Sequence, residues 1–123
     1  MEERPGYLHV RVTGTNSVEA VQGYLGEIYV ACVERGRCSI LIEEHLRGRG
    51  LDLLAIFQIV CEGGERLQAL AHRIAYVDVN GEHPAQDMQF AETVAVNRGV
   101  NLRVFATVPE AAAWLTESAS SRR

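Results

Sequence analysis

Apolar and polar residues alternate in residues 7–13, the pattern typical of a half-buried β-strand. Leu8, Val10 and Val12 are apolar and polar residues separate them. Successive side chains of a strand point to opposite faces, so this stretch predicts a strand with His9 and Arg11 facing away from the core.

The period then changes to three and four residues. Apolar side chains recur at positions 18, 21, 25, 28 and 32, after the hydroxyl and amide side chains of Thr15, Asn16 and Ser17, which are suited to cap a helix. Gly36 follows, and glycine commonly ends a helix. The pattern predicts a long amphipathic helix between these signals.

A short, almost continuously apolar run covers residues 39–43 and predicts a central strand buried on both faces. Residues 44–50 are polar and contain two glycines, so we expect a loop there. Residues 51–71 then favour a helix, although Gly63 and Gly64 leave open whether it is continuous.

The second half of the chain repeats this alternation. Further strands are expected at residues 73–79 and 101–105, and further helices at residues 87–98 and 111–115. In the first of these helices Phe90, Ala91, Val94 and Ala95 are expected to face inward, with Gly99 after its end. Thr107 and Glu110 form a capping box for the last helix. The final six residues are expected to fray.

Four strand-helix pairs in succession predict an α/β fold, because right-handed crossovers connect such strands into a sheet flanked by helices. We expect a mostly parallel sheet of four to five strands in βαβαβαβα order. The chain has 123 residues, which fits a single domain over residues 1–123 with an ordered core of about 6–116.

Composition excludes several activities. All 12 basic residues are arginine, so the chain has no lysine for a Schiff base, a pyridoxal phosphate linkage or a phosphate-binding P-loop. A formal net charge of −4 argues against binding of nucleic acid. No run of 18 apolar residues occurs, so we expect a cytoplasmic protein without stable membrane insertion. Cys32, Cys38 and Cys61 form no CxxC pair and are expected to be free thiols.

The stretch from Leu53 to Cys61 is apolar almost all round, which is more than one buried helix face requires. A homodimer interface explains it best, and a groove for an apolar ligand or a deeply sandwiched helix remain alternatives. The residues expected in this interface or groove are Leu53, Leu54, Phe57, Val60 and Cys61.

Segments 73–77, 90–100, 104–105 and 113–115 together resemble the SpoIIAA-like family, in the STAS/CRAL-TRIO group of small α/β domains. The resemblance implies an open sheet flanked by helices and a role in protein-protein regulation or small-molecule sensing. Antagonist relatives use a phosphorylated serine after the central strand, but residues 43–52 contain no hydroxyl here, so that switch is not expected. Only six residues precede Tyr7, which leaves little room for the family's extra N-terminal strand.

Loops beyond the carboxyl ends of parallel strands are the usual place for a ligand. The candidate ligand-binding residues in these loops are Thr15, Asn16, His45, Arg47, Arg49, Asn80, His83 and Thr107. His45 and His83 could meet there beside Glu43, Glu44 or Glu82, a mixed set that suits a divalent ion. No HxxxH or HExxH spacing supports this arrangement, so surface histidines are expected, without a metal or another cofactor.

The residues that could carry chemistry do not combine into a catalytic motif. Arg47 and Arg49 flank Gly48 before a helix and could hold an anion, although a solvated basic loop is the favoured interpretation. Asp78 could be a buried carboxylate, but a capping role is favoured. No nucleophile has an adjacent base, so no catalytic residues are assigned.

We therefore expect a non-enzymatic regulatory or protein-interaction domain, homodimeric and with a possible protein partner. The alternative is a carrier or sensor of a small apolar or anionic ligand. In that case Leu53, Phe57 and Val60 would line a groove, and Arg47 or Arg49 would hold the head group.

Overall fold

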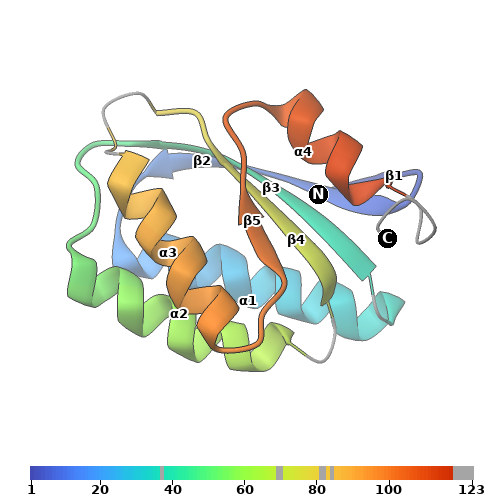
Figure 1. Cartoon of the computed structure of the whole chain (residues 1–123), viewed down its shortest axis with the longest axis horizontal. Helices are drawn as coiled ribbons and strands as arrows, with labels where there is room; N and C mark the ends of the chain where they lie inside the picture. The colour runs from blue at the N-terminus through green and yellow to red at the C-terminus, as the bar shows by residue number, and fades with distance from the viewer. Residues whose placement is uncertain (37, 69–70, 81–82, 84, 118–123) are drawn as a thin grey trace.

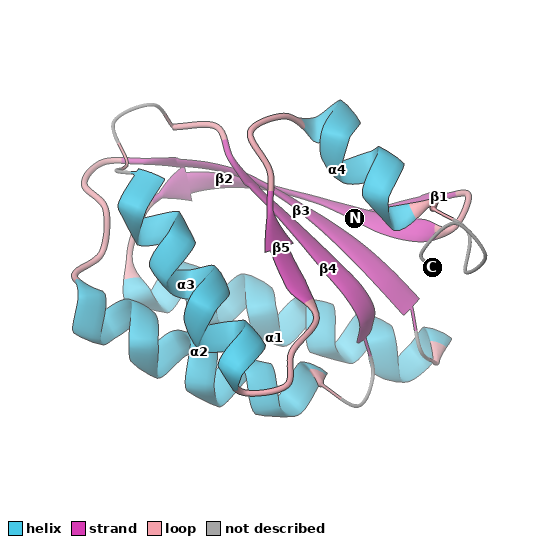
Figure 2. Cartoon of the chain, in the orientation of Figure 1, coloured by secondary structure: helices cyan, strands magenta, loops and turns pink. Residues whose placement is uncertain are grey.

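The computed structural model describes residues 1–36, 38–68, 71–80, 83 and 85–117. It has an α/β fold with one five-stranded sheet and four helices in this part of the chain (Figures 1 and 2). The elements are β1 (Glu2–Arg4), β2 (Tyr7–Thr15), α1 (Val18–Arg35), β3 (Cys38–Arg47), α2 (Leu53–Leu67), β4 (Ala71–Asp78), α3 (Ala85–Asn97), β5 (Leu102–Val104) and α4 (Val108–Leu115).

The sheet is mixed, which corrects the expectation of a mostly parallel sheet. Its strand order is β1-β2-β3-β4-β5; β1 pairs antiparallel with β2, and the three other pairings are parallel. The antiparallel strand is formed by residues before Tyr7, where the sequence indicated little room for one. A tight turn at Pro5 and Gly6 makes this possible, because Gly6 adopts a φ of 90°.

Three helices cover one face of the sheet and the fourth covers the other (Figure 1). The strands β2 to β5 are parallel neighbours in the order of the sequence. Because right-handed crossovers connect such strands, α1, α2 and α3 lie on the same face. Alternation along β3 divides the core accordingly: Ile40 and Ile42 belong to the cluster shared with α1 and α2, whereas Leu41 packs with the α4 residues Ala111 and Leu115.

Strand β3 extends to Arg47, four residues past Glu43, where the sequence predicted a loop. Glu44 and His45 can lie in this strand because each has a partner: Glu44 accepts a hydrogen bond from Tyr24, and His45 contacts Glu43 on the other face. Leu46 then returns to the core, with 1% of its surface exposed. Hydrophobicity alone therefore placed the end of this strand too early.

Helix α2 runs without a break through Gly63 and Gly64. A Cβ atom at Gly64 would lie 3.0 Å from the Val100 side chain, so glycine permits close packing here. The expected caps are confirmed at Ser17 and Thr107, which accept hydrogen bonds from the backbone of Ala20 and Glu110. The expected fraying of the last six residues lies outside the described residues.

No helix in the described part of the chain is both long enough and apolar enough to cross a membrane.

Candidate functional site: an apolar cavity with a polar end

A cavity of about 110 Å³ lies between the sheet and the layer formed by α1, α2 and α3. Its walls are mainly apolar, and the three helices and the strands β3 to β5 all contribute to them. Apolar residues of the wall include Val21, Leu25, Ile42, Ile56, Ile59, Val60, Ile74, Met88 and Ala91. A concave apolar space of this kind is the usual form of a small-molecule site.

Five polar side chains form one end of the cavity, near the carboxyl ends of β3 and β4. They are Tyr24, Glu44, Tyr76, Asp78 and His83. We refer to this group as the polar end. Its position agrees with the general rule that ligands of open α/β sheets bind beyond the carboxyl ends of the strands.

Glu44 is the most buried acid of the polar end, with 3% of its surface exposed. Burial raises the pKa of its carboxyl group, because a charge in a dry environment loses its hydration. The Tyr24 hydroxyl donates to Glu44 Oε2 at 2.6 Å, and Tyr76 is a second donor. These hydrogen bonds oppose the effect of burial without cancelling it, so the pKa remains raised.

Asp78 and His83 form a buried ion pair beside Glu44. His83 Nδ1 lies 2.6 Å from Asp78 Oδ2, and the two side chains are 3% and 4% exposed. His83 Nε2 lies 3.0 Å from the Gly48 carbonyl oxygen. Because both ring nitrogens face acceptors, the geometry suits the doubly protonated imidazolium. Burial lowers the pKa of His83, but the hydrogen bond and charge of Asp78 outweigh it and raise the pKa.

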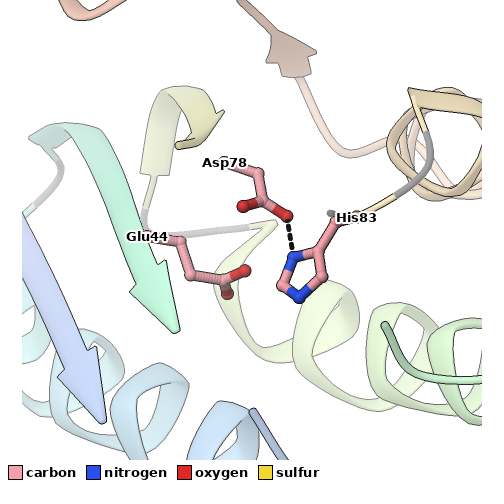
Figure 3. A group of neighbouring side chains, drawn as sticks. All are labelled: Glu44, Asp78 and His83. Atoms are coloured by element: carbon pink, nitrogen blue, oxygen red, sulfur yellow. Dashed lines mark hydrogen bonds and ion pairs between the residues drawn. The ribbon is translucent and has the colours of Figure 1, made fainter. Parts of the chain in front are cut away.

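The side chains of Glu44, Asp78 and His83 point toward one another (Figure 3). One oxygen or nitrogen of each lies within 4.8 Å of the others. Glu44 belongs to β3, Asp78 ends β4, and His83 follows in the loop before α3. The arrangement can accept hydrogen bonds, compensate a positive charge or supply ligands to a metal ion.

Some of the residues predicted from the sequence do meet at this site. Asn16 and His83 line the cavity. Asn80 supports them from outside: its side-chain amide donates to the Leu46 carbonyl at 2.9 Å and lies 3.3 Å from His83 Nε2. Asp78 combines both roles considered for it, because it pairs with His83 and also accepts a hydrogen bond from the Asn80 backbone.

His45 and His83 do not meet, which corrects the suggestion that they could share an ion. His45 lies on the α4 side of the sheet, with its Nε2 atom 2.5 Å from Glu43 Oε2. His9 Nε2 lies 2.8 Å from the other oxygen of Glu43. Alternation along β3 is the reason, because residues 43 and 45 face one side and residue 44 faces the other. Glu82 lies outside the described residues.

Most of the remaining predicted residues lie away from the cavity. Thr15, Arg47 and Arg49 are exposed, and Thr107 caps α4. Of the residues expected in a groove, Val60 lines the cavity, whereas Leu53, Leu54 and Phe57 are exposed and Cys61 is half-buried. The proposed anion-holding arginines and the apolar wall therefore do not form one site. Cys32 is buried, and the side chain of Cys38 is outside the described part.

Sequence reasoning missed Tyr24 and Tyr76, and it named Glu44 only as one of three possible partners of His45 and His83. The two tyrosines were not among the candidate residues, and Glu44 was placed in a loop. One signal was available: Tyr24 lies three residues after Val21 and four before Ile28, on the buried side of α1. A buried tyrosine hydroxyl requires a partner, and a buried carboxylate is a suitable one.

Comparison with known proteins identified no relative of this chain. No protein-family model matches the chain, and neither a curated protein nor a solved structure matches it. The site is therefore interpreted from its own geometry.

Proposed function

We propose that this protein is a non-enzymatic carrier or sensor of a small, mainly apolar molecule that bears a hydrogen-bond donor or a cationic group. The observation that carries this proposal is the apolar cavity that ends at the carboxylates of Glu44 and Asp78. Cavities of roughly this size can hold one aromatic ring. The family resemblance, which includes small-molecule sensing, points in the same direction.

The charges at the polar end support a donor or a cation as the head group of the ligand. An anionic head would face two carboxylates, of which only Asp78 is paired with a cation, His83, and bringing like charges together away from water is costly. Arg47 and Arg49 are exposed and do not line the cavity, so they do not offset that cost. An ammonium or hydroxyl group, in contrast, could donate to either carboxylate.

The hydrogen bonds of His83 support binding rather than catalysis. Its Nδ1 atom contacts Asp78 and its Nε2 atom contacts the Gly48 carbonyl. A general base needs a nitrogen that can accept a proton from the substrate, and both nitrogens of His83 already face acceptors. We therefore assign this ring a structural and electrostatic role.

A series of small benzene derivatives tests the proposal, because they share one apolar body and differ in the head group. Calorimetry would compare benzylamine, benzyl alcohol, toluene and benzoate. We expect benzylamine and benzyl alcohol to bind more tightly than toluene, and benzoate to bind most weakly. Benzoate binding as tight as benzylamine binding in metal-free buffer would contradict the proposal.

Two matched variants locate the binding. Ala91 lines the cavity, so Ala91→Leu should fill it and weaken benzylamine binding at least tenfold. Ala113 is exposed on α4, and Ala113→Leu should leave the affinity unchanged. Equal affinities for the two variants would show that the ligand binds elsewhere.

A second function, protein interaction through self-association, is favoured by a separate observation. Leu53, Leu54 and Phe57 are 51%, 66% and 38% exposed on α2. Exposed apolar side chains that cluster on one face often mark an interface. We propose that this face, the α2 patch, forms a homodimer interface, in keeping with the regulatory role that the family resemblance implies.

Sedimentation velocity tests the α2 patch. A dimer is expected for the unmodified chain and a monomer for Leu54→Asp. Val96 on α3 has a similar exposure of 56%, so Val96→Asp is the control and should remain dimeric. An unmodified chain that is monomeric at high concentration, or a Leu54→Asp variant that remains dimeric, would exclude this interface.

A further inference from the structure

We propose that Glu44, Asp78 and His83 form a binding site for a divalent transition-metal ion, for which Zn²⁺ and Co²⁺ are suitable probes. The site itself does not require that an organic molecule binds in the cavity. A second consequence, described below, does rest on the proposed function.

The geometry is close to that of a coordination sphere. The three donor atoms lie within 4.8 Å of one another. Ligands about 2.1 Å from one zinc ion are roughly 3 to 4 Å apart. The side chains can therefore close around an ion through displacements of about 1 Å, which rotamer adjustments can supply. The backbone elements that carry Glu44 and Asp78 are neighbouring parallel strands, paired at these two residues.

The donor set and its surroundings suit such an ion. Two carboxylates and one imidazole are typical ligands of Zn²⁺ and related metals. Glu44 is buried and little of the Asp78 and His83 side chains is exposed, so an ion would compensate the charge of two acidic groups that have little contact with water. His83 Nδ1 would exchange the proton that it shares with Asp78 Oδ2 for the metal, and that proton would pass to solvent.

Groups outside the triad already orient its carboxylates. Tyr24 donates to Glu44 Oε2, and the Asn80 backbone amide donates to Asp78 Oδ1 at 2.9 Å. Each carboxylate thus has one oxygen held by an outer partner, as in many metal sites in which such partners fix the ligands. The adjoining cavity leaves space for a further ligand, the arrangement found where zinc keeps an open position.

The second consequence concerns head-group selection. Without a metal ion, the two carboxylates favour a donor or a cation. A bound divalent ion would compensate their charge and offer its open position to an anionic oxygen, so benzoate should then bind more tightly than benzylamine. A metal-dependent reversal of preference distinguishes this site from a simple acidic pocket.

Titration of the metal-free full chain with Co²⁺, followed by visible absorption and calorimetry, tests the site. We expect one Co²⁺ per chain and at least a tenfold loss of affinity for His83→Gln and for Asp78→Asn. His45→Gln is the matched control, because this histidine also contacts a glutamate but on the opposite face. It should bind Co²⁺ as the unmodified chain does. Thermal unfolding monitors the folding of each variant, and His83→Gln decides the outcome if Asp78→Asn does not fold.

Three results would overturn the proposal: no binding of Co²⁺, binding lost in His45→Gln but retained in His83→Gln, or a charge-transfer band typical of thiolate ligation, which would place the ion at a cysteine. The two proposals can fail separately. Co²⁺ binding without any benzylamine binding would retain the metal site and exclude the proposed function, whereas the opposite result would exclude only the metal site.

Discussion

Glu43 and Glu44 are neighbours on β3, yet they lie on opposite faces of the sheet and behave oppositely. Glu43 is 16% exposed and lies between His9 and His45. Burial raises the pKa of its carboxyl group, but the hydrogen bonds and charges of the two histidines outweigh this effect, and its pKa is lowered. Glu44 has tyrosine hydroxyls as partners and is deeply buried, so its pKa is raised.

The difference shows how one strand can carry two kinds of polar group. On the α4 side, the glutamate has two histidine rings as partners and some contact with water, which favours its ionised form. On the cavity side, burial beside an apolar wall and the nearby charge of Asp78 disfavour that form, and the tyrosine hydroxyls and His83 oppose them only in part. The first arrangement is expected to stabilise the sheet, whereas the second would leave an acid available to the ligand that we propose.

The largest effect is expected when Glu44 loses a donor. Tyr24→Phe removes the hydroxyl that donates to its Oε2 atom and should destabilise the fold by about 1–3 kcal/mol, the usual cost of a buried polar group without its partner. Urea unfolding measures this cost. Tyr29→Phe is the control, because Tyr29 lies on the same helix but outside the polar end, and it should change stability much less. Equal costs for the two variants would contradict the role assigned to Tyr24.

Replacing each glutamate with glutamine should destabilise the fold only at Glu43 at pH 7. Glu43→Gln should lower the free energy of unfolding by about 1 kcal/mol, because two charge-assisted hydrogen bonds are lost. Glu44→Gln should leave it unchanged or raise it, because a buried charge is removed while an amide oxygen can still accept from Tyr24. If both substitutions lowered the free energy of unfolding, the difference inferred between Glu43 and Glu44 would be contradicted.

The pH dependence of these effects follows from the direction of each pKa shift. Glu43 has a lowered pKa in the folded state, so it stabilises the fold above its unfolded pKa, and this contribution is lost as pH falls through the folded value. Glu44 has a raised pKa, so its contribution is present below the unfolded pKa and is lost as pH rises through the folded value. Both variants should therefore approach the stability of the unmodified chain in acid, from opposite sides, when urea unfolding is repeated between neutral pH and pH 3.

The smallest effect is expected for one histidine partner of Glu43. His45 is 27% exposed, and His45→Gln should cost about 0.2–1 kcal/mol, the usual range for an ion pair near the surface. High salt should reduce this cost, whereas it should change the cost of Tyr24→Phe little, because that pair is buried. A His45→Gln cost that is independent of salt would show that packing, and not charge, is responsible.

Sequence patterns predicted much of this fold. The alternation of strands and helices, the caps at Ser17 and Thr107 and the apolar run at the start of β3 all follow from local rules. The mixed sheet could not be predicted in the same way. Strand β1 has only three residues, all of them exposed, so no hydrophobic pattern marks it, and its pairing with β2 depends on the turn before Tyr7.

The site was predicted only in part, for a related reason. Asn16, Asn80 and His83 were found because they lie in loops at the expected edge of the sheet. Glu44 was assigned to a loop because it is polar, and only the continuation of β3 shows that it faces the cavity. A strand that carries partnered polar residues cannot be recognised without knowledge of their partners, which lie far away in the sequence.

Methyl chemical-shift mapping during titration with benzylamine tests the central claim most directly, because it locates the ligand on the folded chain. We predict saturable shifts for Ile56, Val60 and Met88 in the cavity wall, and none for Leu53 and Leu54, which lie on the same helix but face solvent. Shifts confined to Leu53 and Leu54, or no saturable shifts at all, would contradict the assignment of the cavity as the binding site.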